Sequence, residues 1–512
     1  MKQIFTLIHY DLRSQLRERG TLILMLVALL LAAFGLFEGT RFERNARQAV
    51  ASAAAQEFQA RADANTLAQR YFSDPAAPEF SDLKWYRTPI DIRGYAFREH
   101  VGFAAKPAIP GAGLAIGQAD LLPPYVRVRA ESMESVRTAL EIEHPARLAA
   151  GRFDLVFFVI YLWPLVLLTL TTSVLTQDRE SMRLRALQLQ GVRLGHLLVA
   201  QIAARTLAAT ALLLAICVAG ALTISTVTFD FAGYAALLKW SGVVLLYSMF
   251  WATVAIAICA ICGNRISAAF AGFGAWIVLA ILIPGAISVV IRFQSPMPQR
   301  ESYVQAMRDA ADLVAANKLD SLARFYDSHP EWRPATALDK LASSVSRLQR
   351  AQELERVMAS VDQQFEQARQ DQQRRFEKWR VLSPVALAYQ ALVHIAGNDS
   401  DRHQRFLREV QQHQQRLRDY FQRTIQVSAL GDERSPCPAT CLGGYGFRDF
   451  DRVPTFAASS GLSTSSGTRT HLIPLLLWMT GLMGLAGLLL ARPWLNGKQQ
   501  RIGADTRQGL HF

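Results

Sequence analysis

The sequence predicts a mainly α-helical, polytopic membrane protein with six transmembrane helices and two large regions outside the membrane. Hydrophobic residues make up 51% of the 512 residues and charged residues only 19%, which is more apolar than is typical of a soluble protein. The apolar residues gather in six stretches close to the ~18 residues that a spanning helix needs. Long polar segments follow the first and the fifth stretch. The predicted spans are residues 21–37, 153–177, 196–224, 238–262, 267–291 and 471–491.

Two of these spans contain a proline inside the apolar stretch, Pro164 and Pro284. Proline lacks an N–H group and breaks a helix in water. In a bilayer, neighbouring helices can bind the carbonyl groups that a proline frees, so both stretches are kept as spans. The first span ends at Phe37, and no small-x-small cleavage site follows it. We therefore expect an uncleaved anchor rather than a signal peptide.

Lysine and arginine residues near the span ends predict that both chain termini lie in the cytoplasm. The short loop 225–237 contains neither residue type and is placed outside. Much of the net charge of +13 then lies where anionic lipid headgroups attract it, so no nucleic-acid partner is needed to explain it. The predicted cytoplasmic segments are 1–20, 178–195, 263–266 and 492–512, and the predicted outside segments are 38–152, 225–237 and 292–470.

The N-terminal segment 1–20 carries apolar residues at every fourth position, namely Ile4, Ile8, Leu12 and Leu16. With arginines beside them, this spacing predicts an amphipathic helix lying in the inner membrane interface. The alternative is an ordinary cytoplasmic extension of the first span.

The two large outside regions differ in character. The first, 38–152, opens with a polar helical pattern and then turns rich in proline and glycine, which predicts short strands or extended runs. The second, 292–470, is dominated by glutamine, arginine and glutamate and predicts helices. Neither region has a rich apolar core, so we expect the two to pack on each other or on a second copy. The helices predicted in the second region are 297–328, 335–380, 384–396 and 401–426.

Two of the five cysteines, Cys437 and Cys441, lie in the second outside region, where the compartment is oxidising. Their short spacing favours a local disulfide that pins a turn. Free thiols or a metal site are the alternatives.

No motif for catalysis occurs in the chain. There is no phosphate-binding Gly-x-x-x-x-Gly-Lys-Ser/Thr loop, no His-Glu-x-x-His and no Gly-x-Ser-x-Gly, so we expect no ATPase or other active site on this chain. Glu409 and His413 lie four residues apart on a predicted helix that also carries His403. A metal pair is one interpretation, but a solvated helix face explains them better.

Few charged residues lie inside the predicted spans. One of them, Arg205, either reaches the interface or pairs with a neighbouring helix, with a contact to substrate as the alternative. Because buried Asp, Glu and Lys are lacking, the spans do not favour a proton- or sodium-coupled transporter.

The loop between the second and third spans is the most informative segment. It is a charged, amphipathic helical stretch that joins the cytoplasmic ends of two spans. At such a position a membrane protein can accept force from a soluble partner. The alternative is that its charges only set the topology. The residues we expect to couple the chain to such a partner are Asp178, Arg179, Glu180, Arg183, Leu184, Arg185 and Leu187.

The chain resembles the ABC-2-type permeases, the six-helix membrane subunits of ATP-driven transporters. These commonly carry Glu-Arg-Glu-x-Gly-Thr-Leu-x-Leu-Leu after the second span, which here reads Asp-Arg-Glu-Ser-Met-Arg-Leu-Arg-Ala-Leu over 178–187. Met182 and Arg183 stand where the pattern has Gly-Thr, and Gly191 replaces a later proline. The chain looks most like a little-characterised subgroup with a large helical insertion before the last span. Phrases matching that subgroup are residues 114–121, 144–154, 295–300, 382–384 and 447–454.

The resemblance implies a bacterial inner-membrane exporter subunit with large periplasmic domains. Two separate ABC ATPase subunits would bind ATP and Mg, so this chain would hold no cofactor. A second copy would complete a homodimer, or a better-matching permease a heterodimer, among membrane lipids. Two other functions remain open. The complex could transmit ATPase motion to a periplasmic partner without moving a substrate, or the chain could be a non-transporting scaffold or sensor.

Overall fold

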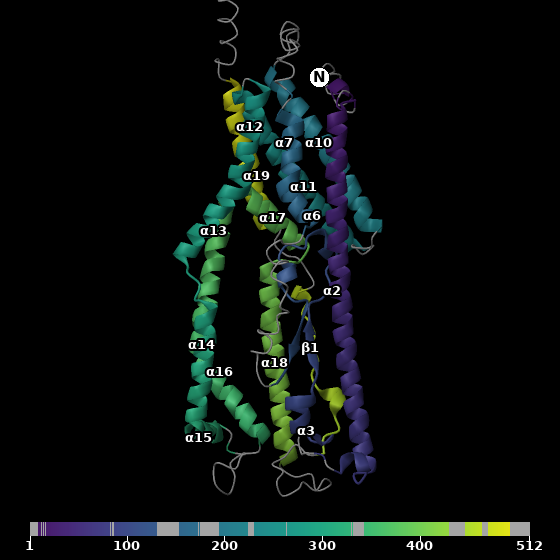
Figure 1. Ribbon diagram of the computed structural model, residues 1–512, viewed down its shortest axis with the longest axis vertical. Coiled ribbons are helices and arrows are strands. Elements are labelled where there is room, and N and C mark those ends of the chain that lie inside the picture. The colour runs from purple at the N-terminus through teal and green to yellow at the C-terminus, as the bar shows by residue number, and fades with distance from the viewer. Residues whose placement is uncertain are drawn as a thin grey trace, which may run out of the picture.

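A computed structural model describes the greater part of the chain as a long, mainly helical molecule (Figure 1). The apolar helices gather at one end, and a helical part with one small β-ribbon extends from them. The described residues are 9–11, 13, 15, 17–81, 83, 87–130, 153–172, 174, 194–223, 230–262, 264–328, 330, 343–429, 446–462 and 469–491.

The helices, in chain order, are α2 (Arg19–Ser73), α3 (Ile92–Gly94), α6 (Leu155–Phe157), α7 (Trp163–Thr172), α10 (Leu194–Thr223), α11 (Phe231–Ile261), α12 (Arg265–Trp276), α13 (Ile283–Gln294), α14 (Arg300–Ala316), α15 (Lys318–Ser328), α16 (Ser343–Trp379), α17 (Pro384–Ile395), α18 (Ser400–Ala429) and α19 (Arg469–Ala491). The strands β1 (Gly102–Ala105) and β2 (Tyr125–Val128) pair antiparallel, with Gly102 opposite Val128. Short 3-10 turns lie between these elements.

Five helical stretches in the described residues are long and apolar enough to cross a membrane. They overlap the first five predicted spans, so the chain is a mainly α-helical membrane protein. The sixth predicted span lies in α19, whose described apolar stretch, Leu472–Leu488, is shorter. The count of six therefore stays a prediction. The five stretches are Arg19–Ser73, Leu155–Thr172, Gly195–Thr223, Phe231–Ile261 and Arg265–Gln294.

The first span does not end near Phe37 as a separate element. It continues without a break into the polar helix that follows, forming the 55-residue α2, roughly 80 Å long at ~1.5 Å per residue. No proline interrupts residues 19–73, and the helix-favouring alanine, arginine and glutamine of the polar half continue the helix. The polar helical pattern predicted after the span therefore belongs to the same helix, because the change from apolar to polar composition does not end a helix.

The two proline-containing spans have the same local structure just before the proline. A π-helical stretch, Phe158–Leu162, precedes Pro164, and another, Ile277–Leu282, precedes Pro284. The wider π turn accommodates a residue that cannot donate to the carbonyl four positions before it. In the first of these spans, the carbonyl of Ile160 accepts a hydrogen bond from a tyrosine of α11 instead. Both helices therefore continue past their prolines, as predicted.

Helix α11 lies at the centre of the apolar bundle and packs against α7, α10, α12 and α19. It begins at Phe231, capped by the Asp230 carboxylate, which accepts from the Gly233 N–H at 2.7 Å. Part of the predicted loop 225–237 is thus helical, a correction explained by this cap.

The short apolar helix α17 packs against the spans. It packs against α11 and α19, and its buried residues, such as Val385 and Leu392, join the same core as Trp163 and Trp240. The sequence correctly predicted the helix but placed it within the outside region 292–470. Its apolar character alone could not show which core it joins.

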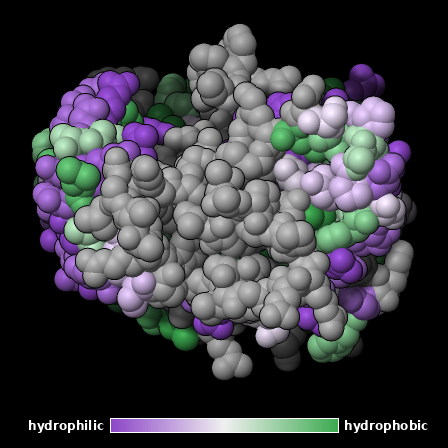
Figure 2. All heavy atoms as spheres, turned by 90° about the horizontal axis from the view of Figure 1, so that it is seen from below, coloured by the Kyte–Doolittle hydropathy of each residue, from purple (hydrophilic) through white to green (hydrophobic). Residues whose placement is uncertain are grey.

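The two regions predicted to lie outside the membrane share a second core, so they pack on each other as expected. Ile92, Tyr95 and Val128 of the first region pack with Phe406 and Phe421 of α18 in the second. The predicted helix 297–328 is divided at Asn317 into α14 and α15. In Figure 1, α14, α15 and α16 lie to one side of α18 and the β-ribbon. Seen from the end opposite the apolar helices, the described surface is largely hydrophilic with scattered hydrophobic residues (Figure 2).

Candidate functional site

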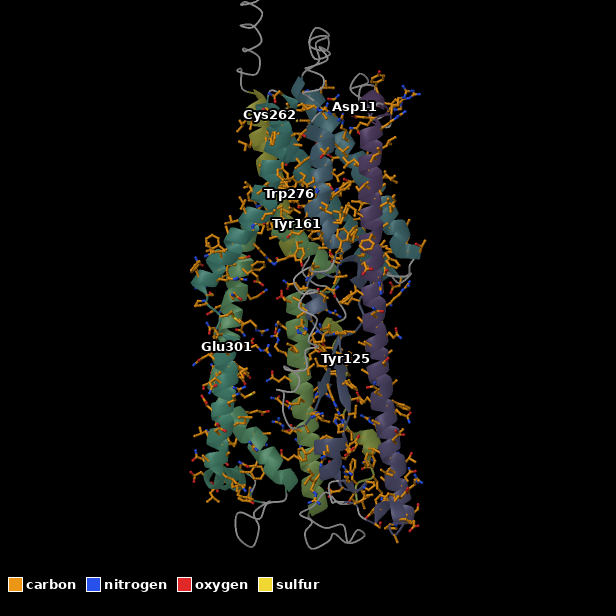
Figure 3. The ribbon with its side chains drawn as sticks, viewed as in Figure 1. Asp11, Tyr125, Tyr161, Cys262, Trp276 and Glu301 are labelled. Atoms are coloured by element: carbon orange, nitrogen blue, oxygen red, sulfur yellow. The ribbon has the colours of Figure 1, made fainter. Side chains whose placement is uncertain are left out.

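A buried ion pair joins the N-terminal segment to the apolar bundle. Arg205 of α10 donates from Nε to Asp11 Oδ2 at 2.7 Å and from Nη2 to Asp11 Oδ1 at 2.5 Å. Its Nη1 donates to the carbonyl of Leu170 in α7 at 2.9 Å. Asp11 lies at the end of the bundle where α2 begins (Figure 3). One guanidinium group therefore holds three segments of the chain together.

The geometry of this pair makes it a strong contact. The two side chains are only 7% and 12% exposed, and the carboxylate is held by two parallel N–H groups. Bidentate, charge-assisted hydrogen bonds are shorter and stronger than neutral ones. The predicted pairing of Arg205 with a neighbouring segment is thus what the structure describes, and both partners lie inside the protein.

A second linkage ties the spans to the outside regions through residues 107–117, which we call the junction loop. Glu43 of α2 accepts a hydrogen bond from the Gly113 N–H at 2.9 Å. Asp154, which caps α6, accepts from the N–H groups of Ile116 at 2.9 Å and Gly117 at 3.1 Å. Helices α2 and α6 are thereby bonded to one loop of the region 38–152.

The second outside region holds the same loop from the other side. The Asn398 amide, in the turn between α17 and α18, donates to the carbonyls of Ala112 at 3.0 Å and Ala115 at 2.6 Å. Arg402 of α18 is buried and donates to the Pro107 carbonyl at 2.5 Å. The same guanidinium donates to the carbonyls of Gly397 and Leu462, each at 2.9 Å. The junction loop is therefore a shared attachment for α2, α6, α17 and α18.

Close backbone packing reinforces this attachment. Gly35 and Gly39 lie on the buried stripe of α2. A side-chain carbon on Gly39 would clash with the Gly113 carbonyl oxygen, and one on Gly35 would lie 2.8 Å from the Leu155 backbone nitrogen. Only glycine allows α2 to approach the loop and α6 this closely.

The predicted coupling residues, Asp178, Arg179, Glu180, Arg183, Leu184, Arg185 and Leu187, lie outside the described residues. The same is true of Cys437 and Cys441, so the predicted disulfide is untested. What the structure does describe is the two helices that the coupling loop connects, α7 and α10. Arg205 belongs to α10, and its guanidinium bonds this helix to α7 through the Leu170 carbonyl.

The histidines and glutamate considered as metal ligands have other partners. Glu409 accepts from the backbone N–H of Ser459 at 3.0 Å and from its hydroxyl at 2.5 Å. His413 packs edge-on against Phe456, and His403 packs beside Phe406. No group of three His, Cys, Asp or Glu residues able to hold a metal ion occurs among the described residues.

Sequence reasoning missed the junction residues. Asp154 and Ser383 each precede a helix and act as N-caps, a pattern that can be read from the sequence. The contacts that Glu43 and Asn398 make join residues 70 to 286 positions apart. No local pattern signals such pairs.

Comparison with known proteins gives one match. Residues 300–433, which include α14 to α18, match the model of a domain of unknown function, DUF3526. No curated protein and no solved structure matches the chain. The matched segment is well under half of the chain, and it carries Asn398 and Arg402 of the attachment to the junction loop.

Proposed function

We propose that the chain is the membrane subunit of an ABC-2-type ATP-driven transporter in a bacterial inner membrane. Two separate ATPase subunits bind ATP and Mg at the cytoplasmic face, and two permease copies, identical or related, form the transport path between them. The large regions outside the bundle lie in the periplasm. Export is the expected direction, and the chain itself carries out no ATP chemistry.

The observation that carries the proposal is the contact of Arg205 with Asp11 and Leu170. The predicted coupling loop 178–195 joins α7 to α10, and Arg205 bonds α10 to both α7 and the N-terminal segment. A push on that loop would move two helices that are already tied to the N-terminal segment. This arrangement supports a unit that moves together under force from a soluble partner.

A matched set of loop variants tests the proposal. The full-length chain is purified from its native host, its partners are identified by mass spectrometry, and ATP hydrolysis is measured. We expect an ATPase to copurify, and Glu180→Ala and Arg183→Ala to lower or uncouple its activity. Arg265→Ala, which removes a basic residue from the other predicted cytoplasmic turn, is the control and should leave activity unchanged. Recovery of the intact chain without an ATPase contradicts the proposal.

If Arg183→Ala and Arg265→Ala reduce expression alike and neither changes ATP hydrolysis per complex, the loop charges serve topology instead. That result would contradict the coupling role of the loop. Copurification of an ATPase would still test, independently, whether the chain is a transporter subunit.

The junction loop favours a second candidate function, transmission of ATPase motion to a periplasmic partner without passage of a substrate. Spans and outside regions are bonded through the same few residues, Glu43, Asp154 and Asn398. Motion of α2 or α6 would thus reach α18 directly. Hydrogen exchange across residues 107–117, measured on the complex with and without ATP, tests this. Unchanged exchange there, alongside active transport, would contradict transmission.

A further inference from the structure

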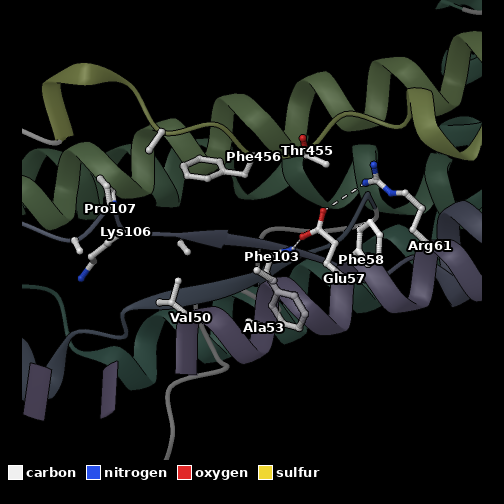
Figure 4. Close-up of a pocket in the computed structure, with 14 residues that line it drawn as sticks. Val50, Ala53, Glu57, Phe58, Arg61, Phe103, Lys106, Pro107, Thr455 and Phe456 are labelled. Carbon is white, nitrogen blue, oxygen red and sulfur yellow. Dashed lines mark hydrogen bonds and ion pairs between the residues drawn. The ribbon is translucent and has the colours of Figure 1, made fainter. Parts of the chain in front are cut away.

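A cavity of about 460 Å³ lies beside the outer half of α2. One wall is α2, another is β1 with the residues after it, and a third is the segment around Phe456 (Figure 4). Its volume is within the ~300–1,000 Å³ of ligand pockets. The cavity is separate from the Arg205 contact, and the function proposed above does not use it.

The walls of this cavity are mainly apolar. Val50, Ala53, Phe103 and Phe456 line it. Phe58, also in the lining, is 74% exposed. A cavity of this volume with mainly apolar walls suits an apolar ligand.

Charged residues lie at both ends of the cavity, Glu57 with Arg61 at one end and Lys106 at the other (Figure 4). At one end, Glu57 is already occupied, because its carboxylate accepts from the Phe103 N–H at 2.9 Å and pairs with Arg61 at 3.5 Å. At the other end, Lys106 forms no ion pair with a carboxylate among the described residues; its Nζ lies 5.6 Å from the centre of the Phe406 ring. The cation end is therefore the one open to a partner.

The surroundings of Lys106 disfavour an unpaired charge there. Burial, followed by the nearby Arg402 guanidinium, lowers the pKa of Lys106 to about 7, against a weaker opposing effect of Asp399. His403, the other titratable group close to it, is held neutral by burial, which lowers its pKa to about 3. An anionic group placed against Lys106 would supply the missing partner.

We propose that this cavity binds a single-chain amphipathic anion, an acyl chain lying along the apolar walls with its carboxylate or phosphate head against Lys106. An acyl chain needs no hydrogen bonds, which suits walls whose one carboxylate, Glu57, is already satisfied. A peptide strand would bring N–H and C=O groups that need partners. The Phe103 N–H, which is not used in pairing with β2, is taken by Glu57.

Photolabelling of the full-length chain tests occupancy of the cavity. The protein is placed in nanodiscs of zwitterionic lipid and exposed to palmitic acid carrying a diazirine on its chain. We expect the label on residues 50–61 or 103–108. Ala54→Trp, which fills the cavity, should abolish this labelling, whereas Ala55→Trp, on the neighbouring residue outside the lining, should not. Labelling elsewhere, or labelling unaffected by Ala54→Trp, overturns the proposal.

The headgroup contact is tested separately at Lys106. Lys106→Ala should weaken binding of the acid about tenfold, the loss expected for one charge-assisted contact. With native Lys106, binding should weaken as pH rises from 6 to 8, while Lys106→Arg should bind equally at both. The uncharged alcohol analogue should show no such pH dependence. Equal binding of acid and alcohol at every pH overturns the role of Lys106.

A phosphate-headed single-chain lipid, compared with the fatty acid under the same conditions, identifies the source of the ligand. Tighter binding of either one supports the proposal and assigns the head as phosphate or carboxylate. Displacement of the probe by an extended peptide, and by neither lipid, overturns it.

Discussion

Arg205 and Asp11 form a two-point ion pair between α10 and the N-terminal segment, although 194 residues separate them in the sequence. The guanidinium also binds the Leu170 carbonyl of α7, so it has few unused donors. A charged residue inside an apolar bundle is costly unless it is paired. The pair therefore fixes where the N-terminal segment lies relative to the helices on either side of the predicted coupling loop.

We predict that breaking this pair destabilises the bundle strongly and non-additively. Arg205→Ala or Asp11→Ala alone should each lower the free energy of unfolding, by about 3 kcal/mol where the remaining charge stays buried. The double variant should cost less than the sum, with a coupling energy on the order of 1–3 kcal/mol. Thermal unfolding in detergent measures all four proteins. Additive losses would show that the two side chains do not interact.

A second prediction concerns the close approach of α2 to the junction loop. Gly39→Ala should lower the unfolding temperature and raise hydrogen exchange across residues 107–117, because the added carbon clashes with the backbone of Gly113. Gly242→Ala is the matched control, since a carbon there meets nothing within 4 Å. The control should be neutral or stabilising by about 0.5–1 kcal/mol, the usual gain from replacing a helical glycine. Equal behaviour of the two variants would contradict the packing described.

The elements of this fold were largely predictable from the sequence, whereas its attachments were not. Apolar length predicted the helices that contain Arg205 and Pro164, because spanning a bilayer requires that length whatever the neighbours are. Helix breaks followed proline and cap residues, as at Ser383. The partners of Arg205 and Asn398 depended on how distant segments pack, which leaves no periodic signal. The continuity of α2 likewise leaves no signal of its own, since the composition changes where the backbone does not.

Three buried histidines, which lie in the regions outside the apolar bundle, predict that the protein loses stability in acid. Burial lowers the pKa of His100 to about 3, with Arg61, His413 and Arg127 adding smaller effects of the same sign. Burial likewise lowers the pKa of His403 to about 3 and that of His413 to about 4. Folded pKa values below the unfolded ~6.5 mean that the unfolded chain binds more protons. The stability they allow is complete above pH 6.5 and falls as the pH drops toward 3.

His100 offers the clearest measurement, because it is 4% exposed and neither ring nitrogen has a hydrogen-bond partner among the described residues. Its protonation in the unfolded chain should lower the free energy of unfolding by about 1.4 kcal/mol for each pH unit below pH 6.5. His100→Phe should reduce the slope of unfolding free energy between pH 6 and pH 4.5. His9→Phe, at an exposed position, is the control and should leave the slope unchanged. An unchanged slope in His100→Phe would mean that this imidazole is not buried neutral.

The last prediction concerns the carbonyl that Pro164 leaves free. Tyr247 donates its hydroxyl to the Ile160 carbonyl at 2.9 Å, four residues before the proline, and both groups are buried. Tyr247→Phe should therefore cost about 1 kcal/mol, the size typical of hydrogen bonds between membrane helices. Tyr234→Phe, at an exposed tyrosine of the same helix, should cost nothing measurable.

Restoring the backbone donor should make the tyrosine hydroxyl dispensable. Pro164→Ala supplies the missing N–H, so Tyr247→Phe in that background should cost less than in the native chain. Thermal unfolding of the four proteins gives the coupling between the two positions. If Tyr247→Phe costs the same with or without the proline, the hydroxyl does not compensate for it. Coupling of the expected sign would mean that α11 stabilises the neighbouring span by binding a carbonyl that the span's own backbone cannot satisfy.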